Sequence, residues 1–263
     1  MANPHGSFIW YELLTKDAKA AKKFYDDVIG WNIDAEAPAG GMDYRMINAP
    51  DGQTGGVMQL NADMLANGAK PVWLGYFGVD DVDASVASIV EAGGQVHLPA
   101  FDIPGVGRLA MVTDQQGIPF YVMRGASPES STAYQRMGMG HVSWNELLAP
   151  DDAAALDFYG KQFNVTKVGA MPMGEMGDYS FIGNTESKGD AIGAVMRTPP
   201  GGHSGWFFYF RVPEIAEAKA KIEAGGGEIR QGPMEVPGGE WVISADDPEG
   251  VPFGVVAPAN NAK

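Results

Sequence analysis

The sequence predicts an α+β fold made of tandem duplicated domains, and three observations support this prediction. The segment GSFIWYELLTKDAKAAKKFY at residues 6–25 returns as GHVSWNELLAPDDAAALDFY at residues 140–159. Further along, VWLGYFGV at residues 72–79 returns as GWFFYFRV at residues 205–212. Strand-like and helix-like periodicities also follow each other in the same order within both copies. The 263 residues therefore divide into two domains, each large enough to bury its own core.

The first repeated unit opens with a strand at residues 6–14, which is rich in aromatic and apolar side chains. Thr15 is expected to cap the helix that follows, with Asp17 in the first turn, where a carboxylate suits the helix dipole. Apolar residues at helical spacing then continue until Gly30 ends the run. Two further strands of this unit are expected at residues 43–49 and 55–60.

A second unit repeats this order within the same half. It has a strand at residues 72–79 and a helix at residues 82–91, which Gly93 and Gly94 end. Its last strands are expected near residues 95–98, 108–113 and 119–123. The second half of the chain places helices at residues 152–163 and 215–224. Each half is thus predicted to be two βαβββ modules, whose curved mixed sheet has helices outside and a pocket on its other side.

The repeat also sets the expected domain boundaries. Residues 1–125 form the N-terminal domain and residues 140–263 the C-terminal domain. Between them, residues 126–139 are small and polar and include a proline, which is typical of a linker.

The composition excludes several classes of function. A net charge of −15 argues against nucleic acid and anionic membranes as partners, because both attract basic surfaces. There is no cysteine, so disulfides, thiolate metal sites and thiol nucleophiles are excluded. The start of the chain lacks the pattern of a signal peptide, and a cytoplasmic protein is expected. We find no phosphate-binding loop and no nucleophile elbow.

Several motifs resemble those of one family. The first helix contains Phe24–Tyr25 and ends at Gly30–Trp31, and a D-x-x-G-x-P-F turn occurs at residues 114–120 and again at 247–253. With the W-x-E-L opening, this pattern resembles the vicinal oxygen chelate superfamily of glyoxalases, bleomycin-resistance proteins and extradiol dioxygenases, in its two-domain, four-module branch. The resemblance covers about residues 6–257 and implies a glyoxalase-like fold.

The resemblance also implies where a divalent metal would be held, namely by one residue of the first strand and one of the last strand of each module. In this chain those positions are Ser7 and Gln59, Leu74 and Tyr121, His141 and Arg197, and Phe207 and Gly254. They supply one imidazole, one amide and no carboxylate, whereas a divalent cation needs three or four N or O donors. No metal and no other cofactor is therefore expected.

His141 is the catalytic candidate, because it occupies the family's ligand position on a strand and a neutral imidazole can act as acid or base. The alternative is a histidine that only lines the pocket. Ser143 and Asn145 alternate with it along the strand and are expected to line the same pocket, as ligand-binding residues.

Glu12 and Glu146 lie on the opposite strand face, beside Trp10 and Trp144. Because both copies keep them, a structural role is favoured. The alternative is an acid whose pKa is raised by burial beside tryptophan.

The other ligand-binding candidates are aromatic or basic. Tyr11, Tyr76, Tyr121 and Tyr209 are expected on the pocket side, where phenol rings suit planar or apolar ligands, although they could equally be core residues. Two arginines, Arg197 and Arg211, could bind a ligand carboxylate, or else pair with the chain's many acids.

Two functions from different classes follow. The first is a metal-independent enzyme of lyase or hydroxylase type, acting on small carbonyl or aromatic compounds. The alternative is a non-catalytic protein that binds and sequesters such a compound, as in resistance. An interaction protein with a vestigial pocket is a third possibility. The expected partner is a small-molecule ligand or substrate, and the chain is expected to be a monomer or a weak homodimer.

Overall fold

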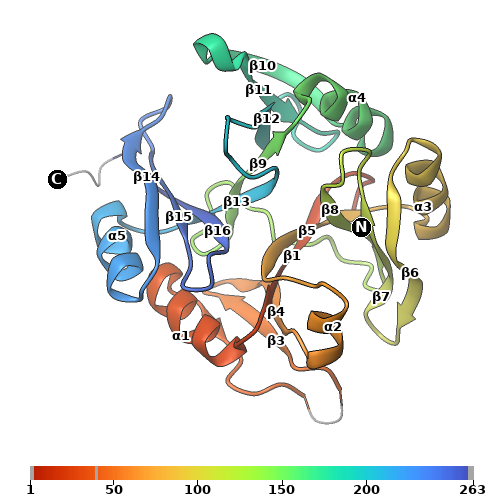
Figure 1. Cartoon of the computed structure of the whole chain (residues 1–263), viewed down its shortest axis with the longest axis horizontal. Helices are drawn as coiled ribbons and strands as arrows, with labels where there is room; N and C mark the ends of the chain where they lie inside the picture. The colour runs from red at the N-terminus through yellow and green to blue at the C-terminus, as the bar shows by residue number, and fades with distance from the viewer. Residues whose placement is uncertain (1–2, 39–40, 260–263) are drawn as a thin grey trace. The chain divides into compact units, whose positions relative to one another are not determined.

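A computed structural model describes residues 3–38 and 41–259 of the chain, and Figure 1 labels its helices and strands. The outer limits predicted for the two domains, residues 1 and 263, lie outside the described residues. The fold consists of four βαβββ modules in chain order. The α+β class with tandem duplication is therefore confirmed.

The first half of the chain contains modules 1 and 2. Module 1 consists of β1 (Phe8–Thr15), α1 (Ala18–Ile29), β2 (Asn32–Ile33), β3 (Tyr44–Ala49) and β4 (Gly52–Gln59). A short helix that the periodicity did not indicate, α2 (Ala62–Ala66), follows. Module 2 consists of β5 (Val72–Gly78), α3 (Val82–Glu91), β6 (Gln95–Ile103), β7 (Gly107–Thr113) and β8 (Pro119–Gly125).

The second half repeats this order. Module 3 consists of β9 (Val142–Ala149), α4 (Asp152–Phe163), β10 (Thr166–Pro172), the 3-10 turn η1 (Gly174–Met176), β11 (Asp178–Gly183) and β12 (Gly193–Arg197). Module 4 consists of β13 (Gly205–Arg211), α5 (Ile215–Ala224), β14 (Glu228–Glu235), β15 (Trp241–Asp246) and β16 (Pro252–Ala257).

Both halves have the same mixed sheet. Its strand order is β2-β3-β4-β1-β5-β8-β7-β6 in the first half and β10-β11-β12-β9-β13-β16-β15-β14 in the second. Within each module the first strand pairs in parallel with the last strand, and the remaining pairs are antiparallel. This register fixes which side chains share a face, because residues directly opposite each other point to the same side of a sheet.

Helix α1 shows how local sequence sets an element. Asp17, and not Thr15 as predicted, is the N-cap, and its Oδ1 accepts hydrogen bonds of 3.0 Å from the backbone amides of Lys19 and Ala20. A carboxylate reaches the free amides of the first turn and also suits the positive end of the helix dipole. Thr15 instead donates its hydroxyl hydrogen to Glu249. Gly30 ends the helix with a φ of 85°, as the sequence predicts.

The modules form two compact units that do not coincide with the halves of the sequence. One unit, called here the first unit, contains the chain up to Trp10, Leu74–Ser131 and Trp144–Trp206, which is mainly modules 2 and 3. The second unit contains Tyr11–Trp73, Thr132–Ser143 and the chain from Phe207 onward, which is mainly modules 1 and 4. Helix α3 contacts α4 in the first unit, and α1 contacts α5 in the second.

A buried hydrogen-bonded chain of Trp, Tyr and Asp holds each unit together. In the second unit, Trp73 Nε1 donates to the hydroxyl of Tyr25, which donates to Asp247 Oδ2, both over 3.0 Å. In the first unit, Trp206 Nε1 donates to Tyr159 over 3.1 Å, and Tyr159 donates to Asp114 over 3.2 Å. The Phe-Tyr pair of one half therefore bonds the D-x-x-G-x-P-F turn of the other half.

Burial changes the acidity of these groups. It raises the pKa of Tyr25 and of Tyr159 well above the ordinary value for tyrosine, and the neighbouring carboxylate adds to the effect. Burial also raises the pKa of Asp114 and of Asp247, although backbone amides of the turn that bond each carboxylate oppose the shift. Each phenol is therefore neutral at neutral pH, because its pKa lies well above the ordinary value for tyrosine.

The connection between the halves packs closely in the second unit. Thr54 Oγ1 donates to the carbonyl of Ala133 over 3.1 Å, and Trp31 Nε1 donates to the carbonyl of Gly140 over 2.6 Å. Gly140 has a φ of 78°, and a Cβ there would lie 3.1 Å from Trp31 Nε1. The segment Thr132–Ser143 thus belongs to a packed unit, although its composition is that of a linker.

In the described part of the chain, residues 3–38 and 41–259, no helix is both long enough and apolar enough to span a bilayer.

Candidate small-molecule site on module 3

The two faces of β9 differ in burial. Asn145, Leu147 and Ala149 alternate along the strand and have no exposed surface. Trp144 and Glu146 point to the other side and are half-buried. Solvent therefore reaches the face of β9 that carries Trp144 and Glu146. Asn145, which the sequence predicts to line the pocket, lies on the buried face.

Strand register shows which residues share the accessible face of module 3. Glu146 is paired with Ala194 of β12, and Ala194 is paired with Phe181 of β11. Tyr179 lies two residues before Phe181 and is paired with Met171 of β10. All of these residues belong to the first unit. Trp144 and Leu148 of β9 and Met196 of β12, which is paired with Leu148, lie on the same face. The side chains on this face are therefore apolar or aromatic, except for the carboxylate of Glu146.

Hydrogen bonds connect the polar atoms of this face into a relay. Trp144 Nε1 donates to the hydroxyl of Tyr179 over 2.9 Å, and that hydroxyl donates to Glu146 Oε2 over 2.6 Å. The rings of Trp144 and Tyr179 also contact Phe181 edge-on, with centroids 6.1 and 5.7 Å away. The relay thus fixes the Glu146 carboxylate within an aromatic wall.

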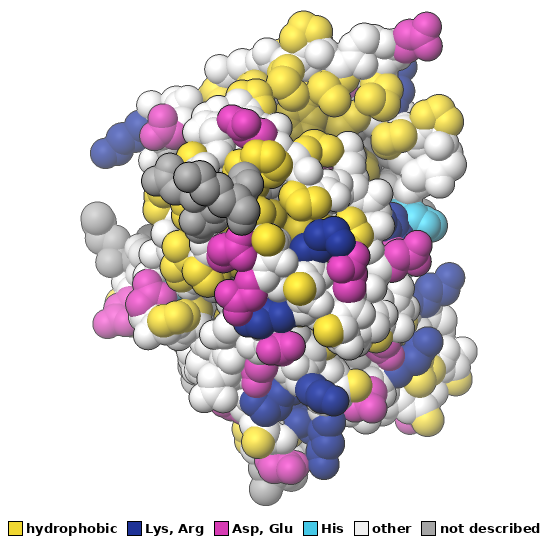
Figure 2. Space-filling view, turned by 90° about the vertical axis from the view of Figure 1, so that its left-hand side faces the viewer, with side chains coloured by type: hydrophobic (Ala, Val, Ile, Leu, Met, Phe, Trp, Pro, Cys, Tyr) yellow, Lys and Arg dark blue, Asp and Glu magenta, His cyan; other side chains and the backbone are white. Residues whose placement is uncertain are grey.

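This arrangement suits recognition and proton transfer. Aromatic walls bind planar or apolar compounds, and a carboxylate held among them accepts a hydrogen bond or a proton from the ligand. Hydrophobic side chains also gather in the upper half of the face in Figure 2. In module 3, Val168 of β10 and Met176 of η1 are exposed hydrophobic side chains.

His141, the predicted catalytic residue, lies in the second unit, just before β9. Its side chain has no exposed surface, and its Nε2 lies 2.6 Å from Oδ1 of Asp51, a side chain that is 57% exposed. This hydrogen bond lowers the pKa of the Asp51 carboxyl. A substrate could reach this buried imidazole only if a group that covers it moved, and the catalytic assignment of His141 stays a prediction.

Ser143 and Arg211 come together in the same unit, as part of an ion-pair cluster. Arg211 is 1% exposed, and its Nη2 donates to Glu240 Oε1 over 2.6 Å. Its Nη1 donates to the Ser143 hydroxyl over 3.2 Å and to the carbonyl of Arg136 over 3.1 Å. These partners take up Nη1 and Nη2, whereas the buried Nε has no hydrogen-bond partner among the described residues. The cluster supports the Thr132–Ser143 segment, to which Arg136 and Ser143 belong.

Two tyrosine candidates lie together in the first unit. Tyr76 and Tyr121 are paired across β5 and β8, and their rings are stacked with centroids 4.2 Å apart. Both are buried, so the stack fills its side of the sheet.

The remaining candidates are dispersed. Tyr11 is buried against Phe208, and Tyr209 lies over Gly254, where a Cβ would be 2.1 Å from the ring. Asn145 donates to the carbonyl of Ile192 over 3.0 Å. The side chain of Arg197 is 62% exposed and pairs with Asp152 over 3.1 Å.

The residues at the family's metal-ligand positions do not fit a divalent cation. The hydroxyl of Ser7 donates to Glu186, and Gln59 Oε1 accepts from the amide of Ala18 over 3.2 Å. Gly254 has no donor side chain, and the ring of Tyr209 covers it. Within residues 3–38 and 41–259, no three or more His, Cys, Asp or Glu side chains are grouped so that they could hold a metal ion.

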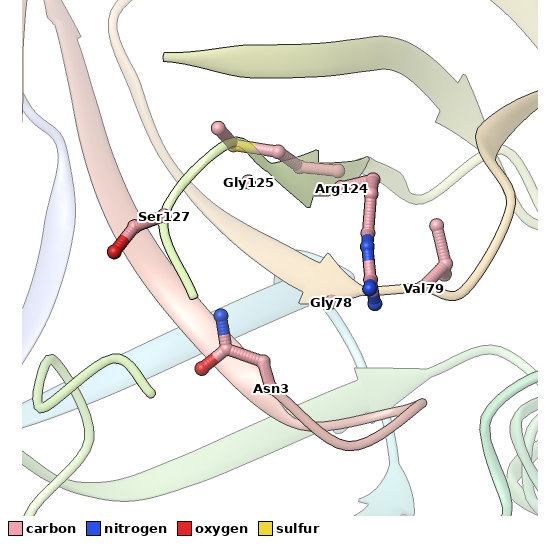
Figure 3. A pocket seen from close by; sticks show the side chains of 7 residues that line it. Asn3, Gly78, Val79, Arg124, Gly125 and Ser127 are labelled. Atoms are coloured by element: carbon pink, nitrogen blue, oxygen red, sulfur yellow. The ribbon is translucent and has the colours of Figure 1, made fainter. Parts of the chain in front are cut away.

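A small pocket lies elsewhere in the first unit, and Figure 3 shows it from close by. Its lining includes Asn3, Val79, Arg124 and Ser127, and none of the predicted site residues. Arg124 pairs with the exposed Asp80 over 3.6 Å.

Comparison with known families settles the membership of the chain. The model of the Glyoxalase/Bleomycin resistance protein/Dioxygenase superfamily matches residues 7–122 and again residues 138–255. The chain belongs to this superfamily. The two matched segments are the two halves of the sequence repeat, so the resemblance inferred from the motifs is confirmed.

Curated relatives match over nearly the whole chain. "Putative glyoxylase CFP32" of Mycobacterium bovis is 34% identical over 95% of this chain and 94% of its own length. "Anthracycline biosynthesis protein DnrV" of Streptomyces peucetius is 27% identical over 95% of this chain and 93% of its own length.

Among solved structures, the fold is similar to extradiol dioxygenases. Homoprotocatechuate 2,3-dioxygenase of Brevibacterium fuscum has a TM-score of 0.66 at 14% identity, over 98% of this chain and 82% of its own. The 2,3-dioxygenase LapB of Pseudomonas sp. KL28 has a TM-score of 0.61 at 14% identity, over 98% of this chain and 93% of its own. At this identity the likeness concerns the fold alone.

Proposed function

We propose that this superfamily member binds a small planar aromatic or carbonyl compound on the accessible face of module 3 and acts on it without a divalent metal. In this proposal Glu146 is the general acid–base, and Tyr179 positions its carboxylate. The relay from Trp144 through Tyr179 to Glu146 is the observation that carries the proposal. Among the residues that the register places on this face, Glu146 has the one carboxylate and Tyr179 the phenol that bonds it, and the other side chains are apolar or aromatic.

The chemistry follows from this placement. Glu146 takes a proton from a C–H next to a carbonyl, or from a hydroxyl of the substrate, and returns it to a neighbouring atom. Tyr179 holds one oxygen of the carboxylate, so the other oxygen has a fixed direction relative to the aromatic wall. This step suits a lyase-type or isomerase-type reaction on a carbonyl compound. A phenol deprotonated in the same way can be oxidised by O2 to a quinone, with one oxygen atom entering the ring, the other leaving as water, and the substrate itself supplying the electrons.

The relatives support the substrate class in general terms. One is named a glyoxylase, which implies a small carbonyl substrate, and another is named for anthracycline biosynthesis, which implies a planar polycyclic aromatic compound. Both classes fit an aromatic wall with a single proton acceptor.

A second candidate is a non-catalytic protein that sequesters such a compound. The apolar and aromatic character of the face favours it, since affinity for a planar ligand needs the wall but not the carboxylate. The two candidates differ in whether Glu146 changes turnover or only affinity.

The test of the site uses alizarin, a planar hydroxyanthraquinone, titrated by its absorbance change. We expect saturable binding by the wild type, weaker binding by Glu146→Gln and Trp144→Ala, and unchanged binding by Glu175→Gln. Glu175 is an exposed residue of η1 in the same module and serves as the matched control. Equal binding by all four proteins would overturn the placement of the site.

The test of catalysis uses phenylglyoxal in water, whose isomerisation with hydration yields mandelate, together with mass spectrometry of alizarin incubations in air. For an enzyme, Glu146→Gln should lower turnover by about 10²–10⁴-fold with a smaller change in binding. Saturable binding of the probes with no product in either reaction would favour sequestration.

A further inference from the structure

Module 1 contains a second copy of the residues that form the module 3 site. Glu12 is paired with Gly56 of β4, as Glu146 is paired with Ala194 of β12. Tyr44 lies two residues before the residue that opposes Gly56, as Tyr179 lies two residues before the residue that opposes Ala194. The copies therefore present the same carboxylate and phenol at the same register. On the strand between them they differ by one methyl group, Gly56 against Ala194, and the residue opposite that position is Met46 in module 1 and Phe181 in module 3.

The missing methyl group at Gly56 lets the ring of Tyr44 pack against the backbone of β4. A Cβ built on Gly56 would lie 2.2 Å from the Tyr44 hydroxyl oxygen and 2.3 Å from Cζ of the ring. The phenol of Tyr44 thus lies directly on the backbone of β4, in space that an alanine would fill. The side chain of Glu12 is only 2% exposed, whereas that of Glu146 is half-buried.

We propose that module 1 carries a second small-molecule site that is held closed by Tyr44 lying on Gly56. Residue 56 decides whether ligand reaches Glu12, and the equivalent alanine at position 194 keeps the module 3 copy open. The chemical class of the ligand, a planar aromatic or carbonyl compound, rests on the proposed function. The closure itself does not, because it concerns only the access of solvent to two carboxylates.

The closure can be reversed by one substitution. Gly56 has no left-handed φ, so alanine is compatible with its backbone. The atoms that a new Cβ would meet are the far end of the Tyr44 side chain, which can rotate outward about χ1. Gly56→Ala should therefore displace the phenol and leave the strand in place.

The experiment labels accessible carboxylates with a carbodiimide and glycine ethyl ester, with the modified peptides quantified by mass spectrometry. In the wild type we expect Glu146 to be labelled and Glu12 to be protected. In Gly56→Ala the labelling of Glu12 should rise severalfold while that of Glu146 stays the same. The reciprocal variant, Ala194→Gly, should lower the labelling of Glu146.

Gly52→Ala is the matched control for the added methyl group. It lies on the same strand, and a Cβ there would meet its nearest atom at 3.6 Å, an ordinary contact. Its labelling pattern should equal that of the wild type. Melting temperatures show whether each variant is folded, and if Gly56→Ala unfolds, Ala194→Gly decides the question alone. Unchanged labelling of both glutamates in the folded variants would overturn the closure.

Titration with alizarin then separates the two proposals. If both hold, the wild type binds one equivalent and Gly56→Ala binds two. If Glu12 becomes labelled in Gly56→Ala but alizarin binds neither protein, the closure stands and the proposed ligand class is wrong. If alizarin binds the wild type through Glu146 but Glu12 stays protected in folded Gly56→Ala, the proposed function stands and the closure is wrong.

Discussion

Replacing Tyr25 by phenylalanine tests the buried chain of Trp73, Tyr25 and Asp247. The substitution keeps the ring and removes only the hydroxyl, which accepts from Trp73 and donates to Asp247 over 3.0 Å each. A buried donor and a buried carboxylate oxygen then both lose a partner. At neutral pH we expect the free energy of unfolding to fall by about 2–4 kcal/mol, from about 1–2 kcal/mol for each lost bond.

The dependence on pH gives a sharper result. An unfolded tyrosine has a pKa of about 10, and burial raises the pKa of Tyr25 well above that value in the folded protein. Above about pH 10 the unfolded state therefore releases a proton that the folded state keeps, and stability falls as pH rises. For one such group the slope is about 1.4 kcal/mol per pH unit. Tyr25→Phe should remove that slope, so its stability declines less steeply than that of the wild type.

Urea denaturation followed by tryptophan fluorescence between pH 8 and about 11, a range chosen to span the ordinary pKa of tyrosine, measures both effects. Tyr159→Phe is the internal replicate, since it breaks the equivalent chain in the first unit. The double variant should lose about 2.7 kcal/mol per pH unit of the alkaline slope if the two chains act independently. An alkaline slope that is identical in the wild type and in Tyr25→Phe would refute the reasoning.

Three further predictions concern the other sites. Arg211→Met removes the buried partner of Glu240 and Ser143, so the free energy of unfolding, measured by urea denaturation, should fall by about 3 kcal/mol. Arg197→Gln removes one partner of an exposed ion pair and should change this free energy by less than about 1 kcal/mol. If Glu146 is the general acid–base, His141→Gln should change turnover by less than about tenfold, because the imidazole is fully buried. A loss of about 10²–10⁴-fold would instead support the catalytic role that the sequence predicts for His141. Because the family's ligand positions lack a donor set, a chelator should leave the melting temperature unchanged, and near-stoichiometric metal in elemental analysis would contradict this.

The sequence predicts the modules well, because their signals are local. The repeat of residues 6–25 at 140–159, the helical spacing before Gly30 and the glycines after the helices at 82–91 and 215–224 each depend on a few neighbouring residues. The helices observed at Val82–Glu91, Asp152–Phe163 and Ile215–Ala224 agree with that prediction. The N-cap of α1 was misassigned because Thr15 and Asp17 are both good caps, and the choice depends on the contact of Thr15 with a residue far along the chain.

The candidate site was harder to predict, because periodicity shows that two strand faces differ but not which face is accessible. Along β9 the polar residue Asn145 faces the buried side, where it bonds a backbone carbonyl, and the aromatic Trp144 faces the accessible side. A polar side chain therefore does not by itself mark the accessible face of a strand. Tyr179 was missed for the same reason, although the shared Asp-Tyr dipeptide at residues 43–44 and 178–179 was a usable signal.

Comparison of the two copies within one chain separates the roles of residues that a single copy would confuse. The residues of the Trp-Tyr-Asp chains are the same in both halves, and each chain joins the Tyr of one half to the Asp of the other. These positions cannot diverge singly without leaving a buried polar atom unpaired. The strand position beside the glutamate carries no such constraint, since it is Gly56 in one half and Ala194 in the other. Duplication can therefore change the access to one site through a single methyl group, while the buried bonds that hold the units together stay the same.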